Sequence, residues 1–409
     1  MLTAQPRTAP SPAGPGSGPR LAWLDAIRGV GATAVLLEHM FYRFLPGLRP
    51  GWFNLGMYGV LVFFLVSGYI IPASLEHRGD VRAFWVGRFF RLYPLYLLVT
   101  GLVLASLPLV PLRPAVVPDA ATAAAHATML LDVVGSGGVA DTMWTLSYEM
   151  VFYLLVTVLF VAGVHRRSGL CAVGFALAAL VVGLLLAAPV LDRGPAAFAA
   201  LGAFVAGLAC VLAPSGWARR AGAVLLGGLA VTLVLLGSRT PWLGPAILAV
   251  MFTGTVIHRW ERGQTGGLRA VAVVTAVLAA VPFFAFPSGW WAHPRVWITT
   301  LALVALTFAG GMALRRRAVP RALVRLGVIS YSVYLLHHPL LKLFLAVFGD
   351  PRERPVGVQA LLAVAFLVVV LALSRLTYRF VERPMQRAGR RLARAWTGPR
   401  PGEAPGSGA

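Results

Sequence analysis

The sequence predicts an all-α polytopic membrane protein with about 10–12 transmembrane helices and both termini in the cytoplasm. Hydrophobic residues make up 58% of its 409 residues and charged residues only 12%, whereas a soluble domain carries about 25% charged residues. The apolar residues are gathered into runs, most of which meet the length of about 17 to 25 residues that a helix needs to cross a bilayer. We therefore expect a multi-pass protein of the cell membrane whose partner is the lipid bilayer.

Twelve apolar runs follow one another along the chain and define the expected helices. The run at 241–258 is the weakest, because Pro241, Pro245 and Gly254 interrupt it. The twelve runs are 21–44, 56–75, 84–107, 143–164, 169–190, 196–213, 221–237, 241–258, 268–286, 296–314, 323–348 and 357–381.

Basic residues between the runs predict the orientation. Loops that follow even-numbered runs are richer in arginine, with clusters such as Arg315–Arg316–Arg317, than loops that follow odd-numbered runs. Because cytoplasmic loops carry the excess of Lys and Arg, twelve helices with both termini inside fit best. Ten helices would also keep both termini inside, if one weak pair does not span. The same pattern accounts for the net charge of +22, so we expect no nucleic-acid partner.

The chain is expected to divide into three parts. Residues 1–20 are predicted to be a disordered cytoplasmic tail, 21–386 the transmembrane domain, and 387–409 a basic and then disordered cytoplasmic tail. The longest non-cytoplasmic loop, 108–142, is predicted either to lie on the outer surface or to cover a cavity. The two cysteines lie in or beside apolar runs and predict neither a disulfide framework nor a metal site.

The first run carries charges that a membrane helix normally avoids. It contains Asp25, Arg28, Glu38 and His39, and charges at membrane depth are costly and usually functional. Arg28 and His39 are eleven residues apart, which puts them within roughly 20° of each other on a helix and about 16 Å apart along its axis. This stripe predicts a buried site that binds an anion and moves a proton. Asp25 and Arg28 also have the spacing of a local ion pair at the interface.

The third and fourth runs contain further charged candidates. Arg88 and Arg91 lie three residues apart near the cytoplasmic end of the third run, where they either anchor the helix at the interface or bind phosphate oxygens. Glu149 is the only acid of the fourth run, about 10 Å below its outer end if the helix starts at Thr142. A carboxylate at that depth needs an Arg or His partner or a proton, which makes Glu149 a candidate site residue.

The eleventh run places several polar side chains in an apolar helix. Ser330, Tyr331 and Tyr334 precede His337 in the stretch ISYSVYLLHHP. Polar and ionisable side chains inside a membrane helix usually face the interior of the bundle rather than lipid. Ser330, Tyr331 and His337 are therefore candidate substrate or supporting contacts.

Six motifs, taken in order, resemble those of the membrane-bound acyltransferase-3 family, bacterial acyl-CoA-dependent O-acyltransferases that modify sugars, cell-surface glycans and some antibiotics. The resemblance covers residues 21–384, although 165–322 matches only in hydropathy. Members usually have ten spanning helices, and many have a second acid where this chain has Met150. The motifs are LDAIRGVGATAVLLEH, VFFLVSGYII, RFFR followed by LYP, WTLSYEMVFY, ISYSVYLLHHP and YRFVERP.

The resemblance implies a role for each candidate residue. His39 would be the general base that takes the proton from an acceptor hydroxyl, or part of the acyl-transfer relay. Arg28 would stabilise anionic charge on the donor or the oxyanion, and Glu149 would orient His39 or the acceptor. Arg88 and Arg91 would hold the phosphates of the donor.

The resemblance also implies the substrates. The donor would be acyl-CoA, with acetyl-CoA expected, used as a co-substrate with no bound cofactor or metal. The acceptor would be a hydroxyl group of a sugar, a glycan or a secondary metabolite. Asp25, Ser330, Tyr331 and His337 would support substrate binding.

Two other functions compete with acyl transfer. A secondary transporter of an anionic or sugar-like solute would also have many helices and buried charges, but carriers tend to show internal repeats and paired broken helices, which this sequence lacks. A structural or lipid-scaffold protein would leave Glu149 and His39 without a role.

Overall fold

The computed structural model describes residues 22–264 and 267–397, and within them the chain forms helices and loops without a strand. The tail predicted at 1–20 lies outside the described residues, as does 398–409. The helices are α1 (Ala22–Phe44), α2 (Leu55–Arg78), α3 (Val81–Ala105), α4 (Ala120–Thr128), α5 (Trp144–Val161), α6 (Ser168–Leu185), α7 (Arg193–Leu212), α8 (Gly216–Thr232), α9 (Leu243–Glu261), α10 (Leu268–Phe284), α11 (Pro294–Leu314), α12 (Arg321–Val328), α13 (Ser330–Phe348), α14 (Val356–Thr377) and α15 (Arg383–Thr397).

Every one of the twelve predicted apolar runs is helical, so the predicted fold class is confirmed. By length and composition alone, nine helices of the described chain could cross a membrane. The other three predicted runs correspond to α1, α9 and α10. Of these, α1 carries four charged side chains, at positions 25, 28, 38 and 43, and α10 has 17 residues.

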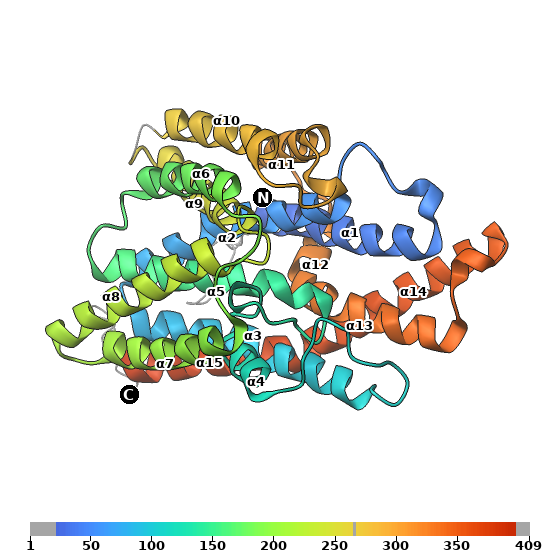
Figure 1. Ribbon diagram of the computed structural model, residues 1–409, viewed down its shortest axis with the longest axis horizontal. Helices are drawn as coiled ribbons and strands as arrows, with labels where there is room; N and C mark the ends of the chain where they lie inside the picture. The colour runs from blue at the N-terminus through green and yellow to red at the C-terminus, as the bar shows by residue number, and fades with distance from the viewer. Residues whose placement is uncertain (1–21, 265–266, 398–409) are drawn as a thin grey trace, which may run out of the picture.

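The long helices run side by side along the horizontal direction of Figure 1 and differ in how deeply they are buried. About 67% of the apolar segments of α2 and α5 is buried, against 17% for the segment that contains α14. The centre of the bundle therefore contains α2 and α5, together with α1 and α9, which both pack on α2. In contrast, α14 presents most of its apolar surface outward, as a lipid-facing helix does.

Glycines allow the central helices α2 and α9 to approach backbone to backbone. A Cβ atom on Gly68 would overlap the carbonyl oxygen of Met251, and one on Gly254 would overlap that of Leu65. Thr255 Oγ1 donates a hydrogen bond of 2.8 Å to the Gly68 carbonyl oxygen. Small residues of this kind are typical of membrane helix interfaces. This contact fixes the distance between two walls of the bundle.

A second close approach corrects the eleventh predicted run. The sequence predicts one helix over 323–348, but the structure breaks it at Ile329 into α12 and α13. The short helix α12 packs against the first turns of α1, where Gly327 meets the carbonyl group of Asp25 and Gly29 meets that of Leu323. Since α12 lies on α1, it cannot continue straight into α13, and the chain turns between them.

The basic end of the chain is helical as far as the structure describes it. Residues 387–397, predicted as the basic part of a tail, form the second half of α15. This helix lies along α3 (Figure 1), with Gly389 against the ring of Phe90. A short π-helical turn, Tyr378–Glu382, joins it to α14.

Substitution of Gly68 by Ala should destabilise the protein more than the same change at an open position. The added methyl group has no space against the Met251 carbonyl, and overpacking of this kind costs about 1–3 kcal/mol. Gly101→Ala is the control, because nothing lies within 4 Å of a Cβ atom on this residue of α3. Thermal unfolding in detergent should show a lower midpoint for Gly68→Ala only. Equal midpoints for the two variants would contradict the close packing of α2 on α9.

Candidate active site

Two cavities lie along α1, one near each end of the helix. The inner cavity, of about 70 Å³, is lined by Arg28. The outer cavity, of about 320 Å³, is lined by His39. The two residues of the predicted stripe therefore face different spaces, separated by about 16 Å of helix axis.

The inner cavity brings together most of the predicted site residues. Arg28 from α1 meets Arg91 from α3 and Glu149 from α5, and Ser330 and Tyr331 from α13 add two hydroxyl groups. The other polar lining residues are Ser67 and Thr145. The remaining wall is largely apolar and aromatic, from Val60, Phe63, Phe64, Leu92, Leu146 and Tyr334. Five helices, α1, α2, α3, α5 and α13, thus converge on a narrow, mostly apolar space with charged groups of both signs.

Charges of both signs surround Arg28. The charged groups that act on it are Arg91, Asp25, Glu149 and Glu382. The Tyr153 hydroxyl donates a hydrogen bond to the Glu149 carboxylate. These interactions supply the partner that a carboxylate at this depth requires.

The two arginines of α3 have different surroundings. Arg91 lines the inner cavity. The Arg88 guanidinium lies over the rings of Phe84 and Tyr153, 5.1 Å and 5.3 Å from their centroids, within the range of a cation–π interaction. Only Arg91 therefore faces the inner cavity directly.

Glu382 belongs to this region but was not predicted as a site residue. It is 3% exposed and accepts a hydrogen bond from the hydroxyl of Ser332, which in turn accepts one of 3.0 Å from Thr377. Glu382 lies in the π-helical turn after α14, and such turns are frequent at functional sites. The nearest charged residues in the sequence are Arg379 and Arg383, so only the fold reveals that its partner is a serine of α13.

Three histidines gather at the outer cavity, which His39 and His338 line. The His39 ring centroid lies 5.1 Å from that of His337 and 5.5 Å from that of His338. His337 is fully buried, and its Nδ1 lies 2.9 Å from the Val333 carbonyl oxygen. A carbonyl oxygen only accepts, so this contact assigns the proton to Nδ1 and leaves Nε2 as an acceptor. That Nε2 has no hydrogen-bond partner among the described residues.

Tyr334 connects the inner cavity to the histidines. It lines the inner cavity, and its hydroxyl accepts a hydrogen bond of 2.9 Å from Thr145. Its ring lies 6.0 Å from the ring of His337, centroid to centroid. The inner cavity therefore ends next to His337, and through it next to His39.

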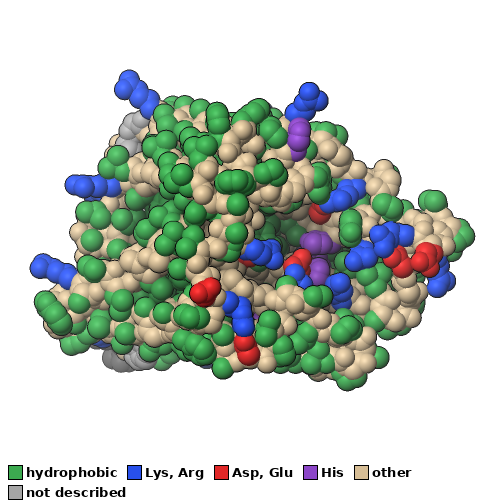
Figure 2. Space-filling model, in the orientation of Figure 1, with side chains coloured by type: hydrophobic (Ala, Val, Ile, Leu, Met, Phe, Trp, Pro, Cys, Tyr) green, Lys and Arg blue, Asp and Glu red, His purple; other side chains and the backbone are tan. Residues whose placement is uncertain are grey.

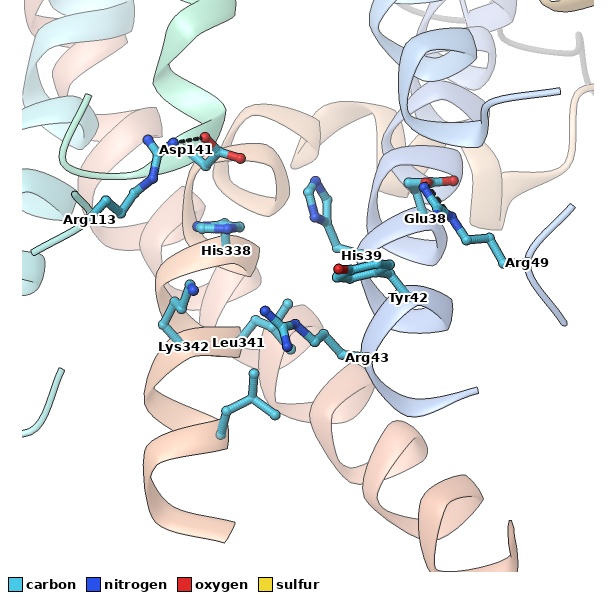
Figure 3. A pocket seen from close by; sticks show the side chains of 11 residues that line it. Glu38, His39, Tyr42, Arg43, Arg49, Arg113, Asp141, His338, Leu341 and Lys342 are labelled. Carbon is cyan, nitrogen blue, oxygen red and sulfur yellow. Dashed lines mark hydrogen bonds and ion pairs between the residues drawn. The ribbon is translucent and has the colours of Figure 1, made fainter. Parts of the chain in front are cut away.

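The outer cavity is a hollow on the face shown in Figure 2, where histidine, basic and acidic side chains gather. Within it Arg49 Nε donates a hydrogen bond of 2.8 Å to Glu38, and Arg113 forms an ion pair with Asp141 (Figure 3). Arg113 and Asp141 belong to the loop 108–142, so this loop lines a cavity, one of its two predicted positions.

Sequence reasoning missed most of the outer cavity. Its charged and histidine residues come from the end of α1, the following loop, the 108–142 loop and the second half of α13. No local spacing connects them, although the neighbouring histidines of the HHP stretch were a signal. The missed residues are Arg43, Arg49, Arg113, Asp141, His338 and Lys342.

The structure separates two residues that were expected to act together. Glu149 faces the inner cavity with Arg28, whereas His39 faces the outer cavity with His338. The groups that can orient the His39 ring are therefore the histidines of α13. Asp25 lies at the α12 contact, near the inner end of α1.

Comparison with known proteins now gives the family. The sequence model of one protein family, described as an acyltransferase domain, matches residues 21–379. The chain belongs to the acyltransferase-3 family. Acyltransferase MdmB of Streptomyces mycarofaciens is 30% identical over 91% of the chain and 93% of its own length.

Two further relatives are named for peptidoglycan. The putative peptidoglycan O-acetyltransferase YrhL of Bacillus subtilis is 26% identical over 90% of the chain. The peptidoglycan O-acetyltransferase OatA of Listeria monocytogenes is 23% identical over 90% of the chain. The chain spans 55% and 56% of the length of these two relatives. The protein is thus a multi-pass membrane O-acyltransferase.

Labelling from outside the cell should reach the outer cavity. Lys342 is half-buried at this cavity, while Arg325 is exposed on α12, near the inner end of α1. In a background with Cys171 and Cys210 changed to Ser, Lys342→Cys should react with a membrane-impermeant maleimide in intact cells. Arg325→Cys, the control, should react only after permeabilisation. Labelling of both, or of Arg325→Cys alone, in intact cells would contradict the assigned orientation.

Proposed function

We propose that this acyltransferase moves an acetyl group from acetyl-CoA to a hydroxyl group of a saccharide, a glycan or a secondary metabolite, at the cell membrane. The observation that carries the proposal is that one helix, α1, presents Arg28 to the inner cavity and His39 to the outer cavity. Relatives named peptidoglycan O-acetyltransferases support acetyl as the group and a glycan as one class of acceptor.

Two features of the inner cavity support a CoA donor, its arginines and its apolar wall. CoA carries phosphates and is a cytoplasmic molecule, and Arg91 and Arg88 lie toward the arginine-rich side of the membrane. Guanidinium groups bind phosphate oxygens bidentately. The narrow, mostly apolar wall beyond them suits the uncharged pantetheine arm, whose thioester end would reach the histidines past Tyr334. Since about 16 Å of helix axis separates Arg28 from His39, Arg28 acts on the charge of the donor rather than on the oxyanion.

His39 carries the chemical step in this proposal. The neutral imidazole takes the proton of the acceptor hydroxyl while its oxygen attacks the thioester carbon. The tetrahedral intermediate then collapses, the carbon–sulfur bond breaks, and His39 returns the proton to the leaving thiolate. The products are the acetyl ester and free CoA. General-base assistance of this kind contributes about 10² to 10⁴ in rate.

His337 positions His39 for this step. Its Nδ1–H is committed to the Val333 carbonyl oxygen, so Nε2 can only accept. If one ring N–H of His39 points toward His337 Nε2, the other ring nitrogen of His39 carries no proton and can act as the base. A second group often fixes the tautomer of a catalytic histidine in this way. Buried beside His39, His337 acts through it rather than on the substrate.

Replacement of His39 by Ala should abolish most acetyl transfer. We expect the rate to fall about 10² to 10⁴-fold because the general base is removed, with no loss of acetyl-CoA binding at the inner cavity. The measurement is turnover of radiolabelled acetyl-CoA by purified protein at matched amounts. His293→Ala is the control, since His293 precedes α11 and lines neither cavity. Normal transfer by His39→Ala would contradict the assignment.

Loss of the α3 arginines should weaken donor binding. Each charge-assisted hydrogen bond contributes about 1.5–3 kcal/mol, so Arg88→Ala/Arg91→Ala should raise the dissociation constant for acetyl-CoA at least tenfold. Arg91→Ala alone should account for most of the effect, because only Arg91 lines the cavity. Arg375→Ala, at an exposed arginine near the inner end of α14, is the control. Failure of folded wild-type protein to bind acetyl-CoA would overturn the donor site and favour a test of solute flux in vesicles.

A further inference from the structure

We propose that the acceptor carries an oxyanion, a carboxylate or a phosphate group, and that Arg43 and Lys342 bind it in the outer cavity. This inference rests on the proposed function, since it assigns the substrate class of the same site. It starts from the surplus of positive charge in that cavity. Four basic side chains line it, from Arg43, Arg49, Arg113 and Lys342, against two acidic ones, from Glu38 and Asp141.

Basic residues are scarce on this side of the membrane, which makes their convergence informative. Arginines are concentrated in the cytoplasmic loops, as the positive-inside rule describes. Three of the few outer arginines nevertheless meet at one cavity, from the end of α1 and from two loops. Lys342, the only lysine among 36 basic residues, joins them from α13. Basic residues that served only to orient the protein in the membrane would lie on the cytoplasmic side instead.

Two of the four cations are already neutralised. Arg49 is paired with Glu38, and Arg113 with Asp141. The described part of the chain offers no ion-pair partner to the other two, Arg43 and Lys342, which are both half-buried.

A further acid, Asp350, does not change this balance. Asp350 lies within the electrostatic reach of Arg43, but it is bound by Arg352, whose hydrogen bonds lower the pKa of Asp350 to about 2. Asp350 is therefore ionised and engaged at neutral pH. The cavity itself keeps two uncompensated positive charges, which an anionic ligand would neutralise.

The spacing of these cations from the histidines sets the size of the acceptor. Arg43 follows His39 by four residues on α1, and Lys342 follows His338 by four residues on α13. Each cation therefore lies one helical turn, about 6 Å, outward of a histidine and on the same helix face. The two helices present these pairs to each other across the cavity (Figure 3).

An oxyanion held between Arg43 and Lys342 would thus place its own molecule against His39. The distance of one helical turn is comparable to the width of a single sugar ring. A hydroxyl on the far side of the ring that bears the oxyanion would reach the base. Arg43 offers a planar fork to the oxyanion and Lys342 a point charge. The cavity volume of about 320 Å³ is within the range of small-molecule sites.

Direct binding tests this inference without depending on catalysis. Equilibrium dialysis of purified protein in detergent would compare methyl glucuronide and glucose 6-phosphate with the neutral methyl glucoside. We expect wild-type protein to bind at least one anionic sugar tenfold or more tightly than the neutral one. The two anionic sugars separate recognition of a carboxylate from that of a phosphate. Arg43→Gln/Lys342→Gln should reduce the preference to less than twofold.

Two controls keep the result specific. Arg295→Gln removes an exposed outer arginine that does not line the cavity and should retain the preference. Arg43→Lys/Lys342→Arg keeps both charges and should also retain the preference, which separates loss of charge from loss of folding.

Absence of a preference in wild-type protein, including absence of binding, would overturn the inference, as would an unchanged preference in the Gln variant. Failure of the proposed function would instead appear as anion binding without transfer from acetyl-CoA.

Discussion

The constraint on which this structure depends is that charged side chains at membrane depth must face protein or water rather than lipid. The first helix carries four such side chains, and the bundle is arranged to enclose them. Close packing of α12 on the first turns of α1, through Gly327 and Gly29, shields its inner end. The second half of α13 and the 108–142 loop enclose its outer end. An ion at the centre of a bilayer costs several kcal/mol, so these charges must be shielded from lipid. Two of the segments that shield them, the second half of α13 and the 108–142 loop, also line the outer cavity.

The two cavities differ in ways that match different substrates. The inner one is narrow, largely apolar and lined by charges of both signs. The outer one is wider, more polar and has an excess of positive charge. At the outer cavity, the rings of His337 and His338 lie 5.1 Å and 5.5 Å from the ring of His39, centroid to centroid. In the reaction that we propose, this division would let the thioester donor and the hydroxyl acceptor approach His39 from different sides.

Much of the fold and half of the site follow from the sequence. Hydropathy alone predicts all twelve helical runs, since each must span or line the bilayer. Polar side chains inside these apolar runs indicate five residues that all line the inner cavity, Arg28, Arg91, Glu149, Ser330 and Tyr331. Local patterns could not predict the break at Ile329, which results from the packing of α12 on α1. Nor could they predict that Glu382 pairs with Ser332, or that loop arginines converge on Lys342. These are contacts between distant segments, and a single sequence carries no signal for them.

We propose that His39 catalyses transfer from a donor in the inner cavity to an acceptor in the outer cavity. The most direct test is to measure acetyl transfer between substrates on opposite sides of a membrane. Proteoliposomes with uniformly oriented protein would hold radiolabelled acetyl-CoA on the side of the arginine-rich loops, with acceptor on the other side. We predict that labelled ester forms on the acceptor side, that it is lost in His39→Ala, and that none forms when the donor is moved to the acceptor side. Transfer only when both substrates share one side would contradict it.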